Sequence, residues 1–294
     1  MQVSFDSYKV FYITAKSNSI TAAAEELYVT QPTVTHCIQK LEKELGCVLF
    51  IRGKKGVKLT PEGKILYNHI SVACEEIWKA EEDIRALKEF KKGEILIGAS
   101  ETTLHHYLFP YLKEYKKKYP NIKIKIQNST TRSTLNAIHK DELDCGILVF
   151  PEQYSEDGIE IKTLETFQDI AIAGCKYEEL SKKIMTLEEL SSYPIISLEN
   201  ATMTNLTFKK LFKQYNVDLK PDIELATTDL IVPAVTNDLG IGFVPDFFAA
   251  EALKKNQIFK LNLVEKFPKR RICLVYKIDK PLSMAVEAFI DCIK

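Results

Sequence analysis

The first sixty residues combine short helical segments with a basic hairpin, and this pattern restricts the fold more than any other feature of the chain. Apolar side chains between residues 5 and 15 fall at spacings that predict an amphipathic helix. Ser19 is placed to cap a second helix over Thr21 to Leu27. The alanines at 22–24 are small enough to let another helix approach closely. We therefore expect two tightly packed helices at the N-terminus.

A third helix is predicted to start at Thr30, which can cap it, with Pro32 in the first turn where a missing N–H costs nothing. Its buried stripe is expected to be Val34, Ile38, Leu41 and Leu45. The opposite face carries polar side chains that can hydrogen-bond base edges and phosphates, namely Gln31, Thr33, Thr35, His36, Gln39 and Lys40. The segment therefore suits a DNA recognition helix, although similar helix pairs occur in proteins that never bind DNA.

A basic hairpin is predicted next. After the apolar run Val48 to Ile51, residues 52–60 contain two glycines and no acidic side chain. A β-wing here would bring Arg52, Lys54 and Lys55 to backbone phosphates or a minor groove; a solvated lysine-rich turn is the alternative. Residues 1–60 hold eight basic and five acidic side chains, a net charge of +3, whereas the whole chain has 40 of each. Basic charge is thus concentrated where DNA contact is expected.

These segments follow one another in the order of a known signature. The stretches Ser19–Leu27, Thr30–Thr35, Leu41–Gly46, Leu49–Arg52 and Leu59–Gly63 resemble the N-terminal domain of the LysR-type transcriptional regulators. The resemblance implies that Gln31, Pro32, Thr35 and His36 approach DNA in the major groove, and that Arg52 and Lys54 make wing contacts. His36 stands where the family often has arginine. A neutral imidazole cannot make the forked contact to guanine, so no operator sequence is predicted.

A long helix is expected over residues 61–90. Its apolar positions alternate steps of four and three residues: Leu66, Ile70, Ala73, Ile77, Ala80, Ile84 and Leu87. This seven-residue repeat predicts a partner helix packed along its length, as in the dimer helix of the family. A helix lying on its own domain would tolerate a broader stripe. A dimer would present two recognition helices to major grooves about 34 Å apart.

Residues 91–294 alternate strand and helix patterns, which predicts a parallel α/β sheet. The expected helix covers Thr103 to Lys118, and the expected strands are Glu94–Ala99, Ile122–Ile126, Leu143–Phe150, Ile170–Ala173, Ile195–Ile196, Ile241–Val244 and Ile272–Tyr276. Hydroxyl groups gather where strands meet helices, at residues 100–102, 129–131 and 197–204. Ligands bind at such joints in open α/β sheets, although each hydroxyl could equally be an ordinary helix cap.

The same region resembles the family's effector domain through Leu143–Ile147 and Leu239–Pro245, with Asp238 where glycine is common. The implied fold is α+β multidomain: a winged helix-turn-helix (1–60), a linker helix (61–90) and a two-lobed, periplasmic-binding-protein-like effector domain (91–294). Lobe I covers about 91–163 and 268–294, and lobe II about 164–267. The resemblance places an effector near Ser100, Thr102, Ser129, Thr130, Ser197 and Thr202. It also implies double-stranded DNA, self-association into dimers or tetramers, and RNA polymerase as partners.

Other functions find less support in the sequence. The length fits about two domains, and the seven scattered cysteines lack metal-like spacing, so reduced thiols in a cytoplasmic protein are expected. No leader or membrane-spanning run and no catalytic or cofactor motif is found, so we expect no membrane, cofactor, metal or catalytic site. His105 and His106 are adjacent and suit loop or surface positions. Two alternatives remain: a two-lobed binding protein or transferase with an N-terminal oligomerisation arm, and a peroxide sensor using Cys145 or Cys175. A small carboxylate or another anion is the favoured effector, although the hydroxyl-rich helix starts would also suit many neutral polar molecules.

Overall fold

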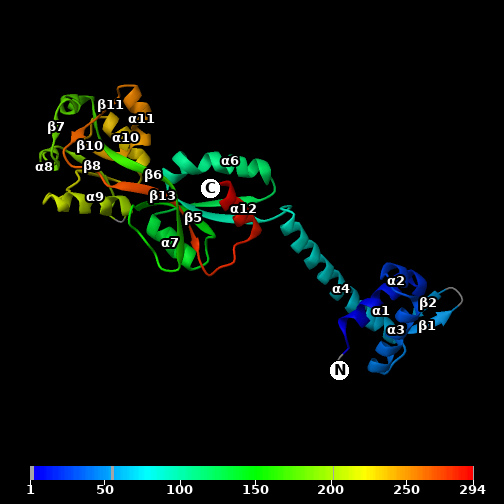
Figure 1. The fold of residues 1–294 in the computed structure, drawn as a ribbon. Coiled ribbons are helices and arrows are strands. Elements are labelled where there is room, and N and C mark those ends of the chain that lie inside the picture. The colour runs from blue at the N-terminus through cyan, green and yellow to red at the C-terminus, as the bar shows by residue number, and fades with distance from the viewer. Residues whose placement is uncertain (1–2, 54–55, 201, 294) are drawn as a thin grey trace. The chain divides into compact units, whose positions relative to one another are not determined.

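The computed structural model describes residues 3–53, 56–200 and 202–293. It divides the chain into two compact units, Met1–Lys88 and Glu89–Lys294, each with its own hydrophobic core (Figure 1). The first unit consists of α1 (Phe5–Ser17), α2 (Ile20–Glu26), α3 (Gln31–Leu45), β1 (Phe50–Gly53), β2 (Gly56–Leu59) and α4 (Pro61–Lys88). The antiparallel pair β1–β2 forms the predicted wing. The winged helix-turn-helix expected from the sequence is therefore confirmed.

Local chemistry explains most of these boundaries. The Ser19 hydroxyl accepts a hydrogen bond from the Ala22 N–H (3.2 Å) and caps α2 as predicted. Thr30 is the N-cap of α3, but its hydroxyl lies 2.8 Å from that of Thr33 and makes no capping bond. The Thr60 hydroxyl accepts from the Gly63 N–H (2.9 Å) and so begins α4. At Gly63 a Cβ would collide with the Leu49 carbonyl oxygen, which explains why glycine follows the threonine here.

Helix α4 uses its first half to complete the core of the first unit. Phe11, Val34, Ile38 and Leu41 are buried there, and Leu66 and Ile70 of the predicted seam pack against them. Cys74 is buried on the same side of α4. The prediction of one continuous partner-facing stripe is therefore wrong for its first two positions. The later positions Ile77, Ile84 and Leu87 remain exposed.

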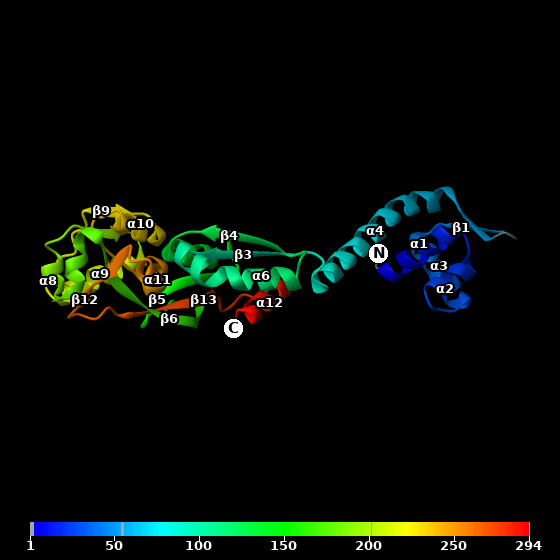
Figure 2. The same ribbon diagram turned by 90° about the horizontal axis from the view of Figure 1, so that it is seen from above.

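Among the described residues, nine strands of the second unit form one sheet in the order β4-β3-β5-β13-β6-β10-β8-β9, with β11 on β6. Their bounds are β3 (Glu94–Ala99), β4 (Lys123–Asn128), β5 (Cys145–Pro151), β6 (Ile159–Gly174), β8 (Ile195–Leu198), β9 (Ile223–Leu225), β10 (Ile241–Pro245), β11 (Ile258–Lys260) and β13 (Lys269–Lys277). The short strands β7 (Ile184–Met185) and β12 (Asn262–Leu263) pair separately. Strand β4 lies beside β3 at one edge (Figure 2).

The sheet is mixed rather than parallel, which corrects the prediction. Strands β3, β4 and β5 run parallel in lobe I, and β8, β9 and β10 run parallel in lobe II. The long strands β6 and β13 both cross between the lobes. They run antiparallel to each other and to their neighbours. The first half of β6 pairs with β13, and from Asp169 onward β6 pairs with β10.

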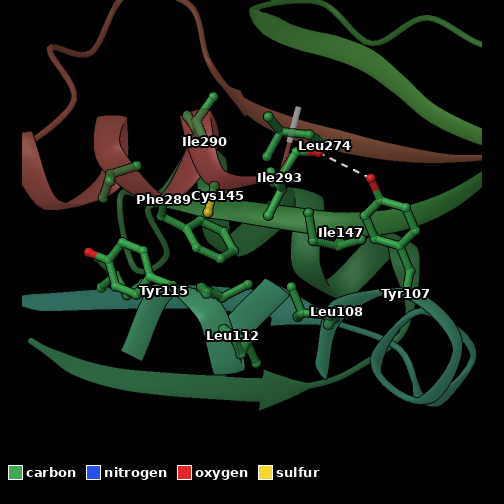
Figure 3. Packing of buried hydrophobic residues seen from close by; sticks show 14 of the residues in the cluster. Tyr107, Leu108, Leu112, Tyr115, Cys145, Ile147, Leu274, Phe289, Ile290 and Ile293 are labelled. Carbon is green, nitrogen blue, oxygen red and sulfur yellow. Dashed lines mark hydrogen bonds between the residues drawn. The ribbon is translucent and has the colours of Figure 1, made fainter. Parts of the chain in front are cut away.

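Helices cover both faces of each lobe (Figure 1). They are α5 (Glu101–Thr103), the π-helix η1 (Leu104–Leu108), α6 (Phe109–Lys118), α7 (Thr131–His139), η2 (Cys175–Lys182), α8 (Leu187–Leu190), α9 (Met203–Gln214), η3 (Thr228–Leu230), α10 (Ile231–Thr236), α11 (Asp246–Lys254) and α12 (Met284–Cys292). In lobe I, η1, α6 and α12 cover the same face, where the Tyr107 hydroxyl donates to the Ile293 carbonyl (3.1 Å; Figure 3). Helices α8 and α9 pack on one face of lobe II, and α10 and α11 on the other.

Asp238 shows how this chain accommodates its departure from the family pattern. The residue adopts a left-handed backbone conformation (φ 58°), which aspartate tolerates better than most side chains. Its carboxylate accepts a hydrogen bond from the Lys176 N–H (2.8 Å). Asp238 therefore keeps the backbone path of a glycine and adds a contact between the turn after α10 and the start of η2.

Candidate DNA-binding surface and effector site

The polar face of α3 is free of the core. Gln31, Pro32, Thr33, His36 and Gln39 are exposed, and Thr35 is half-buried. The Gln31 amide donates to the Thr21 hydroxyl, which joins the start of α3 to α2. The helix pair therefore holds the start of α3 in place while most of its polar side chains stay open to a ligand.

Hydrogen bonds from backbone N–H groups fix the wing and the segment before it to α3 and to the end of α1. The Glu42 carboxylate of α3 accepts from the N–H groups of Leu49 (2.7 Å) and Phe50 (3.3 Å). The Val57 N–H donates to the Asn18 carbonyl oxygen (3.0 Å) at the end of α1. Arg52 is exposed on β1, whereas the predicted contacts Lys54 and Lys55 lie outside the described residues.

A cavity of about 200 Å³ lies between the two lobes of the second unit. Lobe I contributes the segments after β3 and β4, and lobe II contributes the start of α9 and the segment before η3. The residues lining it are mainly hydroxyl-bearing: Ser100, Glu101, Thr102, Asn128, Ser129, Thr130, Thr131, Val149, Leu198, Thr202, Met203, Thr204, Ala226, Thr227, Thr228 and Arg270. The cavity therefore combines many hydroxyl groups with apolar surface and suits a small molecule that carries both.

Five of the six residues predicted to bind an effector line this cavity: Ser100, Thr102, Ser129, Thr130 and Thr202. Ser197 does not line it. It is buried in β8, where its hydroxyl accepts a hydrogen bond from the Asn205 amide (3.2 Å). Thr130 and Thr202 cap α7 and α9, so the first turns of two helices border the cavity. Helix N-termini carry partial positive charge, which favours an anionic ligand.

Sequence reasoning missed the charged group in this cavity. The guanidinium of Arg270 on β13 is bound by both carboxylate oxygens of Asp169 on β6, with Nη1 at 3.1 and 2.9 Å. Nη2 donates to the Thr204 hydroxyl (3.0 Å) in the first turn of α9. Burial raises the pKa of Asp169, and the opposing attraction of Arg270 does not cancel that effect. Thr227 and Thr228, which also line the cavity, were not predicted either.

The histidines and cysteines form no second site. His106 lies in η1, half-buried rather than in a loop or on the surface, with Nε2 2.9 Å from Glu165 and its ring stacked on Phe247. No group of three metal-ligating side chains occurs in the part of the chain that the structure describes. Cys145 is fully buried, and burial raises the pKa of its thiol, whereas Cys175 is exposed. A buried, protonated thiol suits a core position better than a peroxide sensor.

Comparison with known proteins covers nearly the whole chain. The family described as "Bacterial regulatory helix-turn-helix protein, lysR family" matches residues 5–64, and the "LysR substrate binding domain" family matches residues 88–294. The HTH-type transcriptional regulator YofA of Bacillus velezensis is 26% identical over 97% of this chain and 96% of its own length. A full-length OxyR variant from Pseudomonas aeruginosa has a TM-score of 0.77, with 21% identity and full coverage of both chains.

The effector-binding domain of QuiR in complex with shikimate has a TM-score of 0.59 at 20% identity, covering 69% of this chain and 95% of its own. A winged helix-turn-helix joined to a two-lobed domain with a polar cavity defines a ligand-responsive DNA-binding regulator. The chain belongs to the LysR family of bacterial transcriptional regulators. In the described ranges, no helix combines the length and the apolar character needed to cross a bilayer.

Proposed function

We propose that residues 1–60 bind promoter DNA through Gln31, Pro32, Thr33, Thr35, His36, Gln39, Arg52, Lys54 and Lys55, and that residues 91–294 receive a small anionic effector. In this proposal residues 61–90 pair with a second copy, dimers assemble into tetramers, and the protein acts in the cytoplasm on RNA polymerase at its promoters. It needs no cofactor and catalyses no reaction. The bound effector touches Ser100, Thr102, Ser129, Thr130 and Thr202, whereas Ser197 supports the site from within lobe II.

One observation carries the DNA-binding part of the proposal. The polar side chains of α3 and Arg52 on the wing are exposed, although the elements that bear them are tied together by buried contacts. A surface that is preorganised and polar loses little conformational entropy when it docks on phosphates and base edges. The two-lobed transferase alternative assigns these side chains no task.

The test is DNA affinity as a function of salt. A fluorescence-anisotropy titration with a duplex from the protein's own promoter should show that Arg52→Ala weakens binding and reduces the slope of log K against log salt by about 0.9, the loss of one phosphate contact. Arg85→Ala, which removes an exposed arginine from the last turn of α4, is the matched control and should leave both quantities unchanged. An Arg52→Ala protein with unaltered affinity at every salt concentration would refute the proposed interface.

The regulatory part of the proposal follows from the position of the cavity. An effector changes DNA binding only if it binds one arrangement of the lobes, or of the oligomer, more tightly than another. A ligand that contacts segments of both lobes meets this condition, because its contacts depend on how the lobes are set. Footprints of the promoter with and without saturating effector should therefore differ, and identical footprints would rule out this coupling.

A further inference from the structure

We propose that Arg270 receives the charged group of the effector, that the effector is a small monocarboxylate with hydroxyl or amide groups, and that Asp169 is the resident counter-ion of Arg270. This inference rests on the proposed function of the cavity as the effector site.

The geometry of the two crossover strands fixes Arg270 in one orientation. Arg270 pairs with Phe167 across β13 and β6, and Asp169 lies two residues further along β6. Side chains two residues apart on a strand share a face, so Phe167, Asp169 and Arg270 meet on one side of the sheet. The guanidinium carbon lies 5.0 Å from the centre of the Phe167 ring. The Phe167 ring therefore packs against one face of the guanidinium, and Asp169 binds its edge.

Part of the Arg270 guanidinium makes no hydrogen bond to the described residues around it. Arg270 is 3% exposed, yet it lines the cavity. An arginine carries five N–H groups, and the contacts above engage Nη1 with Asp169 and one N–H of Nη2 with Thr204. The Nε–H and the second Nη2 hydrogen make no hydrogen bond to the described residues. A carboxylate that entered the cavity could accept from these donors in the forked geometry that arginine favours.

The charge balance of the cavity limits the ligand to one negative charge. Among the described residues lining it, Arg270 is the one cationic side chain, and an anionic ligand would share its guanidinium with Asp169. The acidic residue Glu101 also lines the cavity, where its carboxylate accepts from the Asn128 amide. The first turns of α7 and α9 add only partial positive charge. A phosphate ester or dicarboxylate would therefore add a second negative charge that no further cationic side chain among the described lining residues could pair with.

The neutral part of the ligand is expected to be polar. Thr102, Thr227 and Thr228 line the cavity, and their hydroxyls make no side-chain hydrogen bond within the described part of the chain. These hydroxyls are therefore available to a ligand that supplies hydrogen-bond donors or acceptors at these positions. Val149, Leu198 and Met203 supply apolar surface beside them.

The test uses matched small molecules on the full chain. Thermal shift at constant ionic strength would compare the monocarboxylates lactate, glycerate, shikimate and benzoate with the amides lactamide and benzamide and the dianions malate and glycerol 3-phosphate. We expect at least one hydroxylated monocarboxylate to raise the Tm, while the amides and dianions do not. Stabilisation by an amide or a dianion equal to that by the best monocarboxylate, or no response to any monocarboxylate, would overturn the assignment.

Three variants then separate the roles of the two charged residues. Arg270→Gln should weaken binding of the stabilising monocarboxylate by about tenfold or more, the value of a lost charge-assisted hydrogen bond. Because this variant strands a buried carboxylate, the Arg270→Gln, Asp169→Asn protein removes both charges and serves as the folding control. Asp169→Asn alone frees the guanidinium and should tighten binding about tenfold. Unchanged affinity in the folded double variant, or weaker binding in Asp169→Asn, would overturn the proposal.

Failure of this inference can be told apart from failure of the proposed function. The same preparations are tested for promoter binding with and without the carboxylates. Carboxylate binding without DNA affinity would refute the regulator function and leave the Arg270 assignment intact. DNA affinity with no carboxylate response would refute the Arg270 assignment and leave the regulator function intact.

Discussion

The Asp169–Arg270 pair allows a quantitative prediction about stability. The side chains of Asp169 and Arg270 are 0% and 4% exposed, so the Asp169 carboxylate has no water to replace Arg270. Removing one member of a buried pair costs about 3–5 kcal/mol, because the other charge stays buried and unpaired. Arg270→Gln should therefore destabilise the second unit by that amount. For a unit of this size, about 2–4 °C per kcal/mol corresponds to a Tm that is roughly 6–20 °C lower.

The double variant decides whether the reasoning holds. Replacing both charges, as in Arg270→Gln, Asp169→Asn, leaves two neutral amides and should restore stability to within about 1 kcal/mol of the native protein. The assay is calorimetry of the full chain, following the transition of the second unit, supported by urea unfolding. As a control, Lys277→Gln breaks the exposed pair with Asp141 (3.0 Å) and should leave the Tm unchanged. A double variant destabilised by the sum of its single changes would refute the coupling.

Three further predictions test other parts of the structure. Gly63→Ala should destabilise the first unit by about 1–3 kcal/mol in urea unfolding through overpacking. Gly53→Ala should be tolerated, because its Cβ would meet the nearest atom of the described residues at 3.8 Å. Equal effects of the two changes would contradict the close packing under α4. Ile84 is an exposed position of the predicted partner-facing stripe of α4. Sedimentation of Ile84→Glu should therefore show a smaller oligomer, with unchanged helix content. An unaltered mass would contradict a dimer interface on α4. Burial raises the folded-state pKa of Asp169 above the unfolded value, so its contribution to stability is complete below about pH 4 and is lost as pH rises through the folded pKa. The urea unfolding midpoint of Asp169→Asn should not show this loss of stability with rising pH. Parallel pH profiles for the variant and the native protein would contradict the prediction.

The sequence was sufficient for features that depend on neighbouring residues. Ser19 caps α2 through the Ala22 N–H, and the hairpin of β1 and β2 lies where glycines and basic residues predicted it. The hydroxyl groups after β3 and β4 were found because strand ends and helix starts can be recognised locally. The same rule admitted Ser197, whose side chain lies inside the strand and bonds to Asn205.

The charged centre of the cavity depends on information that is not local. Asp169 and Arg270 are 101 positions apart and meet only through the antiparallel register of β6 with β13. A weak signal was present, since each stands beside an apolar strand segment, where charged side chains are rarely buried unless paired. The heptad prediction for α4 failed in part for a related reason. A straight helix turns every 3.6 residues, so a seven-residue stripe drifts from the face that packs on the first unit.

The position of Arg270 bears on how a ligand could be sensed. Strands β6 and β13 belong to both lobes, and Arg270 joins them through Asp169 while its Nη2 group holds Thr204 in α9 of lobe II. An anion that binds the remaining donors therefore contacts the crossover itself as well as the surfaces on either side. Its affinity depends on the geometry of that crossover, since a forked contact of an anion with arginine is geometrically specific. A ligand held in this way discriminates between lobe arrangements, and that discrimination is the thermodynamic requirement for changing the state of the DNA-binding unit.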